Sequence, residues 1–326
     1  MNLYLQYICA FVTLLSPIIG QSQGFSNQVF TDSIKTVLLS NEFNMNSFIV
    51  NTASETLPQI TLMSNDKITL RFDLLRSEPK NYSFTIVHCN PNWTPTSIFA
   101  NDYLEGYTEE NIENITFSQN TIEEYIHYDV SFPTENMKIT KSGNYVVLVY
   151  ESGDRNKVVL TQKFFAVSKR VPIVAQPINA GGKSQNSFHQ INFRANISSL
   201  ASTNPTEEFK FAILKNGNQE NISFIKPTFV TPNSLTFLGT PNNIGAGNEF
   251  RQFDTRNINA NIGGIGIYKS IYEAPYYHTI LNPISPRSTS GYVNYNDHNG
   301  RRFILSQSHK SSFVEISSPN LYKTSY

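Results

Sequence analysis

This sequence has little cysteine and little charge, and each shortage excludes a class of function. Only 2 of its 326 residues are Cys, so no disulfide framework is expected. Charged residues make up 15% of the chain, and its 25 basic side chains balance its 25 acidic ones. A nucleic-acid-binding protein normally carries a basic excess or a basic stripe, and neither is present. We therefore expect neither nucleic acid nor a strongly acidic molecule as the partner.

Long apolar runs are also missing, apart from one near the N-terminus. Ile8–Ile19 is mostly apolar, yet it is too short to span a bilayer. Small residues follow in Gly20–Ser22, at the positions that a signal peptidase reads, although no Lys or Arg precedes the run. We interpret residues 1–22 as a secretory signal peptide that is cleaved near Ser22. The alternative interpretation is a buried N-terminal strand.

Removal of this segment takes away Cys9 and leaves Cys89 as the single thiol. A lone cysteine can act as a nucleophile, but no partner motif accompanies this one. Cys89 follows a stretch of alternating residues, which is the usual setting of a small buried hydrophobic side chain. We therefore predict a core position for Cys89.

Aromatic and β-branched residues are abundant, and they favour strands over helices. Aromatics make up 13% of the chain and hydrophobic residues 39%, which is enough for a packed core. No long amphipathic helix is apparent. The sequence therefore predicts a folded protein built from strands.

Period-two alternation predicts the strands of the first half of the chain. Apolar and polar residues alternate strictly in Lys67–Leu74, as in a half-buried antiparallel strand. Tyr82–His88 follows after turn residues, and we expect it to pair with the first strand as a hairpin. Tyr145–Tyr150 is apolar on both faces, which indicates a central strand, and Val158–Val167 completes a second hairpin with it.

A junction is predicted at Ser168–Pro172, where the strand pattern ends and a proline restricts the residue before it to extended geometry. Alternation resumes in Gln190–Ile197 and in Phe209–Leu214. Asn233–Gly247 is expected to be rich in loops because it contains Pro and Gly residues. A further strand is expected within Ile262–Tyr272.

The fold class predicted from these patterns is all-β, with two consecutive immunoglobulin-like antiparallel β-sandwich domains. Residues 23–170 are expected to form the N-terminal β-sandwich and residues 171–326 the C-terminal one.

No catalytic or metal-binding pattern stands out. Asp297–Gly300 combines a carboxylate, an imidazole and an amide, but its Asn-Gly pair predicts a hairpin turn. In Glu249–Arg256 an arginine near each acid would keep that acid ionised, so an ion-paired structural or interface segment is favoured over acid catalysis. No two histidines have metal-ligand spacing on one element: they are His88, His127, His189, His278, His298 and His309.

Two glycine clusters, Gly245–Gly247 and Gly263–Gly266, lack the strand–loop–helix context and the trailing Lys-Ser/Thr of a phosphate-binding loop. We therefore predict a protein that is not an enzyme and has no cofactor and no small-molecule substrate. No catalytic, cofactor-binding or metal-binding residue is assigned.

Several motifs, in the right order, resemble the type IX secretion system plug proteins of Bacteroidota. The segments that carry the resemblance to the first domain of that family are His88–Trp93, Asp102–Gly106, Phe117–Thr121, Tyr125–Tyr128, Phe132–Pro133, Ser142–Tyr145 and Phe164–Val167. Asn248–Arg256 and Asp297–Gly300 resemble the second half. The resemblance runs from about Ile34 to Gly300. Because family members continue well beyond the last of these turns, the closing strands of the C-terminal domain are expected to be either missing, which would make the domain truncated, or divergent.

This resemblance implies a non-catalytic plug or gating subunit in the periplasm, associated with the inner face of the outer membrane. Its partner would be the outer-membrane translocon barrel of the type IX secretion system, whose periplasmic opening it would occlude. The loop around Trp93 and Tyr103 is the candidate docking surface, although both residues also suit a core position. Two rival hypotheses remain: a carbohydrate-binding or adhesin-like β-sandwich, and a secreted hydrolase with an unfamiliar active site.

Overall fold

The computed structural model of the chain describes residues 24–41, 57–76, 78–121, 123–181, 188–215, 222–245, 267–274 and 276–283. The predicted signal peptide, the segment Glu249–Arg256, the turn Asp297–Gly300 and the cluster Gly263–Gly266 lie outside the described residues. Across the described part of the chain, strands predominate, and neither α-helix has the length or the apolar character that a membrane crossing requires.

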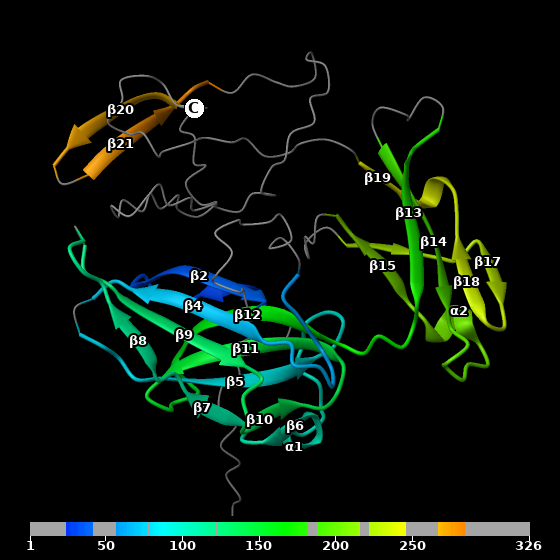
Figure 1. Cartoon of the computed structure of the whole chain (residues 1–326), viewed down its shortest axis with the longest axis horizontal. Helices are drawn as coiled ribbons and strands as arrows, with labels where there is room; N and C mark the ends of the chain where they lie inside the picture. Colours follow the sequence, from blue (N-terminus) through cyan, green and yellow to red (C-terminus); the bar gives the residue numbers. More distant parts are fainter. Residues whose placement is uncertain are drawn as a thin grey trace, which may run out of the picture.

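The N-terminal part of the described chain is a β-sandwich, which we call the N-terminal sandwich (Figure 1). Its elements are β1 (Gln28–Val29), β2 (Ile34–Asn41), β3 (Gln59–Thr61), β4 (Ile68–Leu74), β5 (Tyr82–Cys89), α1 (Ala100–Tyr103), β6 (Leu104–Gly106), β7 (Glu109–Asn111), β8 (Asn114–Phe117), β9 (Ile126–Phe132), β10 (Met137–Ile139), β11 (Gly143–Glu151) and β12 (Val158–Val167).

Two sheets face each other in this sandwich. One has the strand order β2-β4-β9-β8, and the other has the order β1-β12-β11-β5-β7. The outer edge of β12 is shared, because β1 pairs with it antiparallel and β3 pairs with it in parallel. The orders β2-β4-β9-β8 and β5-β11-β12 correspond to the A-B-E-D and C-F-G sheets of an immunoglobulin domain. The predicted all-β sandwich fold is therefore confirmed.

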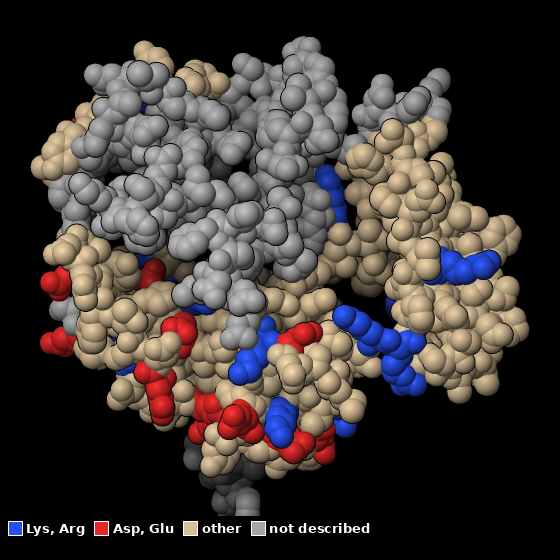
Figure 2. Space-filling view, viewed as in Figure 1, with Lys and Arg blue, Asp and Glu red and all other residues tan. Residues whose placement is uncertain are grey.

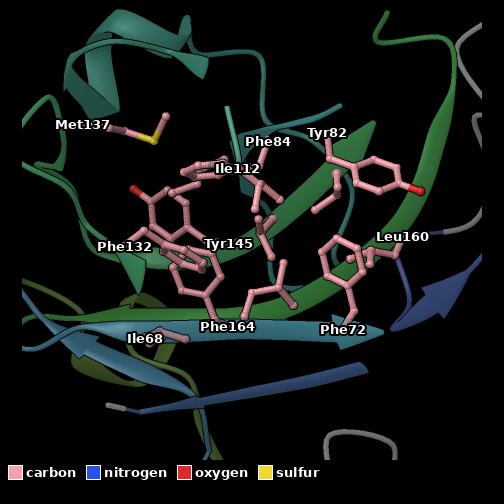
Figure 3. Close-up of a cluster of buried hydrophobic side chains, with 14 of the residues drawn as sticks. Ile68, Phe72, Tyr82, Phe84, Ile112, Phe132, Met137, Tyr145, Leu160 and Phe164 are labelled. Atoms are coloured by element: carbon pink, nitrogen blue, oxygen red, sulfur yellow. The ribbon is translucent and has the colours of Figure 1, made fainter. Parts of the chain in front are cut away.

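Aromatic side chains from both sheets fill the space between them (Figure 3). Phe72 on β4 stacks on Tyr128 of β9 with ring centroids 5.0 Å apart. From the other sheet, Tyr145 stacks on Phe164 at 5.5 Å. Burial of large rings contributes most of the hydrophobic stabilisation of such a core, because each removes a large apolar area from water.

The start of β11 carries a tyrosine corner. The hydroxyl of Tyr145 donates a hydrogen bond of 2.7 Å to the carbonyl oxygen of Lys141, four residues upstream. This device fixes the entry into the corresponding strand of immunoglobulin-like domains.

The predicted pairing of the early strands is half right. β11 and β12 form the expected antiparallel hairpin, and β11 is central because it also pairs with β5. However, β4 and β5 do not form a hairpin, because they lie in opposite sheets. Alternation shows that a strand has one buried face, but it does not distinguish a turn within a sheet from a crossing between two sheets.

The C-terminal part forms a second group of sheets. Its elements are β13 (Ile173–Asn179), β14 (Phe188–Asn196), α2 (Pro205–Glu208), β15 (Phe211–Leu214), β16 (Ile222–Ile225), β17 (Phe229–Thr231), β18 (Ser234–Phe237), η4 (Thr240–Asn242), β19 (Asn243–Gly245), β20 (Ile267–Glu273) and β21 (Tyr276–Leu281). One sheet has the order β13-β14-β18-β17, with β19 also paired to β14, while β15 pairs with β16 and β20 with β21.

This second group has a smaller core of its own. Phe193, Leu235 and Phe237 are buried there, and Phe193 stacks on Phe237 with ring centroids 4.3 Å apart. The expected strand within Ile262–Tyr272 overlaps β20. The expectation of loops in Asn233–Gly247 is partly wrong, because two strands and a short 3-10 helix occupy it. Pro and Gly there mark the ends of very short elements.

Candidate docking surface

Trp93 occupies a tight turn directly after β5. Its N–H donates to the carbonyl oxygen of Asn90 at 2.8 Å, and its φ is +67°. A positive φ is unfavourable for so bulky a residue, so packing must hold it in place. The indole is only 7% exposed and packs edge-on against Phe165 at 5.4 Å, while Nζ of Lys163 lies 4.6 Å from the ring centroid. Trp93 is therefore a core anchor.

His88 contacts residues of two later motifs, those that contain Tyr103 and Tyr145. Its Nδ1 hydrogen-bonds to Oγ1 of Thr96 at 2.9 Å, and its ring lies 5.0 Å from that of Tyr145 and 5.6 Å from that of Tyr103. At Gly143, a Cβ would lie 2.4 Å from Nε2 of His88. The glycine of the Ser-Gly-Asn-Tyr motif thus leaves the room that the imidazole occupies.

Tyr103 ends the helix α1 and points inwards. It is 5% exposed, its hydroxyl donates to the carbonyl oxygen of Ile86 at 3.3 Å, and burial raises its pKa above the usual value for tyrosine. Three residues later, Gly106 has a φ of +94°, and a Cβ there would lie 1.9 Å from the carbonyl oxygen of Asn136. Together they fix β6 against β10.

The hypothesis that Trp93 and Tyr103 are surface residues is therefore wrong, and their core alternative is correct. Tyr103 packs into the main core between the sheets, whereas Trp93 packs in a separate cluster with Cys89 and Val146. Exposed and buried aromatic residues lie within a few positions of one another in this part of the chain. The sequence pattern alone therefore does not show which of them face the solvent.

The exposed large apolar side chains around α1 and β6 are those of Ile98, Phe99 and Tyr107. They flank α1 and β6, and we call residues 98–107 the α1–β6 excursion because the segment leaves both main sheets (Figure 1). Phe99 is 80% exposed and Tyr107 is 62% exposed. Large apolar side chains that stay in water on a well-anchored loop are typical of a protein-binding surface.

Charges of both signs surround this excursion (Figure 2). Asp102 accepts a hydrogen bond from the N–H of Phe99 at 3.2 Å, and Glu105 lies 4.0 Å from Nζ of Lys138. Further along, Arg155 pairs with Glu109 at 2.7 Å. Hydrogen bonds from Tyr150 and Arg155 lower the pKa of Glu109 below its usual range. A mixed rim of this kind suits contact by shape more than capture by charge.

Cys89 has the predicted core position. It is buried, and this burial raises the pKa of its thiol to about 12. Such a thiol stays protonated at neutral pH and is a poor nucleophile.

The described histidines are not brought together, because each lies on a different strand: His88 on β5, His127 on β9, His189 on β14 and His278 on β21. His298 and His309 lie outside the described residues. Among the residues that the structure describes, no three His, Cys, Asp or Glu side chains are grouped so that they could hold a metal ion.

Comparison with known proteins finds one family and a solved structure that are similar to this chain. Residues 34–168 match the family described as the type 9 secretion system plug protein 1st domain. A crystal structure of a hypothetical protein from Parabacteroides merdae is similar to the chain, with a TM-score of 0.76 and 24% sequence identity. The similarity covers 88% of this chain and 70% of that one, and it shows a shared fold. No curated protein matches the sequence.

Proposed function

Because residues 34–168 match the first domain of the type IX secretion system plug family, we propose that this chain is the plug of that system's outer-membrane translocon. In this proposal it is a non-catalytic periplasmic subunit, peripheral to the inner face of the outer membrane. It binds the translocon barrel and occludes the periplasmic opening.

The family match is the observation that carries this proposal. It covers the whole of the N-terminal sandwich after β1, including the anchored turn at Trp93 and the α1–β6 excursion. Several of the motif residues that gave the resemblance, among them Trp93, Tyr103 and Tyr145, are buried in this structure.

The excursion is the surface that we assign to docking. Phe99 and Tyr107 offer apolar area, and aromatic residues of this type contribute most to binding energy when a partner removes them from water. The buried anchors beneath them limit the conformational entropy that would be lost on binding. A rigid sandwich that docks in this way would block a pore by occupying its mouth, and it would leave when a competitor takes the same contact.

Affinity capture from the native envelope tests the proposal. The tagged full chain is expressed in its own host, the envelope is solubilised in mild detergent, and co-purifying proteins are identified by mass spectrometry. We expect a very large outer-membrane barrel to be recovered in stoichiometric amount. Phe99→Ser/Tyr107→Ser is measured alongside, with Phe224→Ser as the matched control because Phe224 is an exposed aromatic on β16.

The outcomes separate the function from the surface. Recovery of the barrel with wild type and Phe224→Ser, but about tenfold less with the double variant, supports both parts of the proposal. Recovery with all three proteins rejects the excursion as the docking surface and leaves the plug function standing. If no barrel is recovered with wild type, the plug proposal fails, and binding to a glycan array becomes the test of the carbohydrate-binding alternative.

A further inference from the structure

Among the described strands, β13 forms the end of its sheet and is paired along one edge only. It pairs with β14 over seven residues without a register shift, and no described strand pairs with its other side. All seven of its residues are exposed, and Val174 is 77% exposed. An edge strand of this length presents a row of N–H and C=O groups to which another strand can add.

The hydrogen bonds to β14 show which residues face the open edge. Ala180 N–H donates to the carbonyl oxygen of Phe188 at 3.0 Å, and Asn196 N–H donates to that of Pro172 at 2.9 Å. In an antiparallel pair, the residues that bond to the neighbour alternate with residues whose backbone groups point away. The residues whose groups point to the open edge are therefore Ile173, Ala175, Pro177 and Asn179.

Pro177 occupies one of these outward positions, and it has no N–H to offer. Its ring stands where an incoming strand would need a donor. Proline in strands is confined to such edges because it costs no hydrogen bond within the sheet. β13 itself carries neither a charged residue nor a bulge, which are two other features that protect edge strands.

A second copy of β13 is the strand that we consider at this open edge. Two β13 strands related by a two-fold axis would pair antiparallel, with Ala175 of each copy opposite Pro177 of the other. In that register each proline faces a carbonyl oxygen and supplies no donor. We infer that the open edge of β13 fits a second copy of this strand, and that Pro177 is the residue that prevents the two copies from pairing.

Self-association of the full chain tests this inference. We expect Pro177→Thr to form dimers or larger assemblies in size-exclusion chromatography with light scattering, at concentrations at which wild type does not. Gln176→Thr is the matched control, because it introduces the same residue at a position whose N–H already faces β14. Ala175→Pro/Pro177→Thr moves the missing donor to the next outward position and is expected to restore the behaviour of wild type.

Each result bears on the inference. It is overturned if Pro177→Thr behaves as wild type, if Gln176→Thr associates equally, or if the double variant still associates. Circular dichroism verifies that the variants are folded, and Pro177→Ala supplies the same donor with a smaller side chain if the threonine variant does not fold. Aggregation of Pro177→Thr during refolding, together with its suppression in Ala175→Pro/Pro177→Thr, would also support the inference.

Discussion

At the scale of single residues, three aromatic rings of the motifs pack against one another around the end of β5. His88, Tyr103 and Tyr145 contact one another through their rings, and Gly143 leaves space for the imidazole. Their polar atoms hydrogen-bond to backbone carbonyls or to Thr96. Residues packed in this way hold the neighbouring loop in one conformation. Their contribution can be measured as a change in the free energy of unfolding.

The tyrosine corner gives the first prediction. Tyr145→Phe keeps the ring but removes the hydroxyl that donates to Lys141 at 2.7 Å, and we expect the free energy of unfolding to fall by about 1–2 kcal/mol. Tyr103→Phe removes a longer bond, of 3.3 Å, and should cost less than about 1 kcal/mol. Equilibrium urea unfolding measures both. Equal losses in the two variants would contradict the assignment of a corner at Tyr145.

At the scale of elements, the α1–β6 excursion depends on its contact with β10. Gly106 is opposite Met137 in the pairing of β6 with β10, and the carbonyl oxygen of Asn136 passes close to its Cα. A side chain at position 106 would both oppose the positive φ and separate the two strands. The excursion is thus held to the sandwich by a close backbone approach.

Gly106→Ala is predicted to loosen this excursion. We expect a loss of more than about 2 kcal/mol, because the methyl group clashes with backbone that has no rotamer to change. Gly153→Ala is the control, since Gly153 also has a positive φ but no atom lies within 4 Å of its Cβ position, so only about 1 kcal/mol should be lost. Thermal unfolding gives the stabilities, and limited proteolysis reports cleavage within residues 98–107. Similar losses of stability in both variants would show that the positive φ, and not the clash with Asn136, causes the effect.

At the scale of the whole molecule, the described chain has hydrophobic clusters that share no residue. The clusters of the N-terminal sandwich draw on residues between Phe25 and Ala166, whereas the smaller cluster draws on residues between Val171 and Phe237. The extended connection between them contributes hydrogen bonds between Arg170 and Ser199. A complete core within one segment is the physical requirement for independent folding.

We therefore predict that the fragment of residues 23–170 folds alone. It should show a single cooperative thermal transition and a dispersed amide spectrum by nuclear magnetic resonance, because all members of its core are present. The fragment of residues 171–326 is the comparison, and its smaller core should give a lower transition temperature. A broad, non-cooperative transition for the first fragment would show that the junction lies elsewhere.

The class of fold, the hairpin of β11 and β12, and the core position of Cys89 could all be predicted from the amino-acid sequence. These follow from side-chain alternation and composition, which reflect burial on one face of each strand and need no knowledge of distant contacts. The family resemblance likewise depended on short motifs, some of whose residues are buried.

Three features required the folded structure: β4 and β5 belong to opposite sheets, Trp93 and Tyr103 are buried, and Phe99 and Tyr107 are exposed. The open edge at Pro177 also became visible only from the direction of its hydrogen bonds. Each of these depends on which distant segment packs against a residue. The strand propensity of an aromatic residue is the same whether its side chain is buried or exposed. The packing of the two sheets therefore decides which aromatic residues are buried.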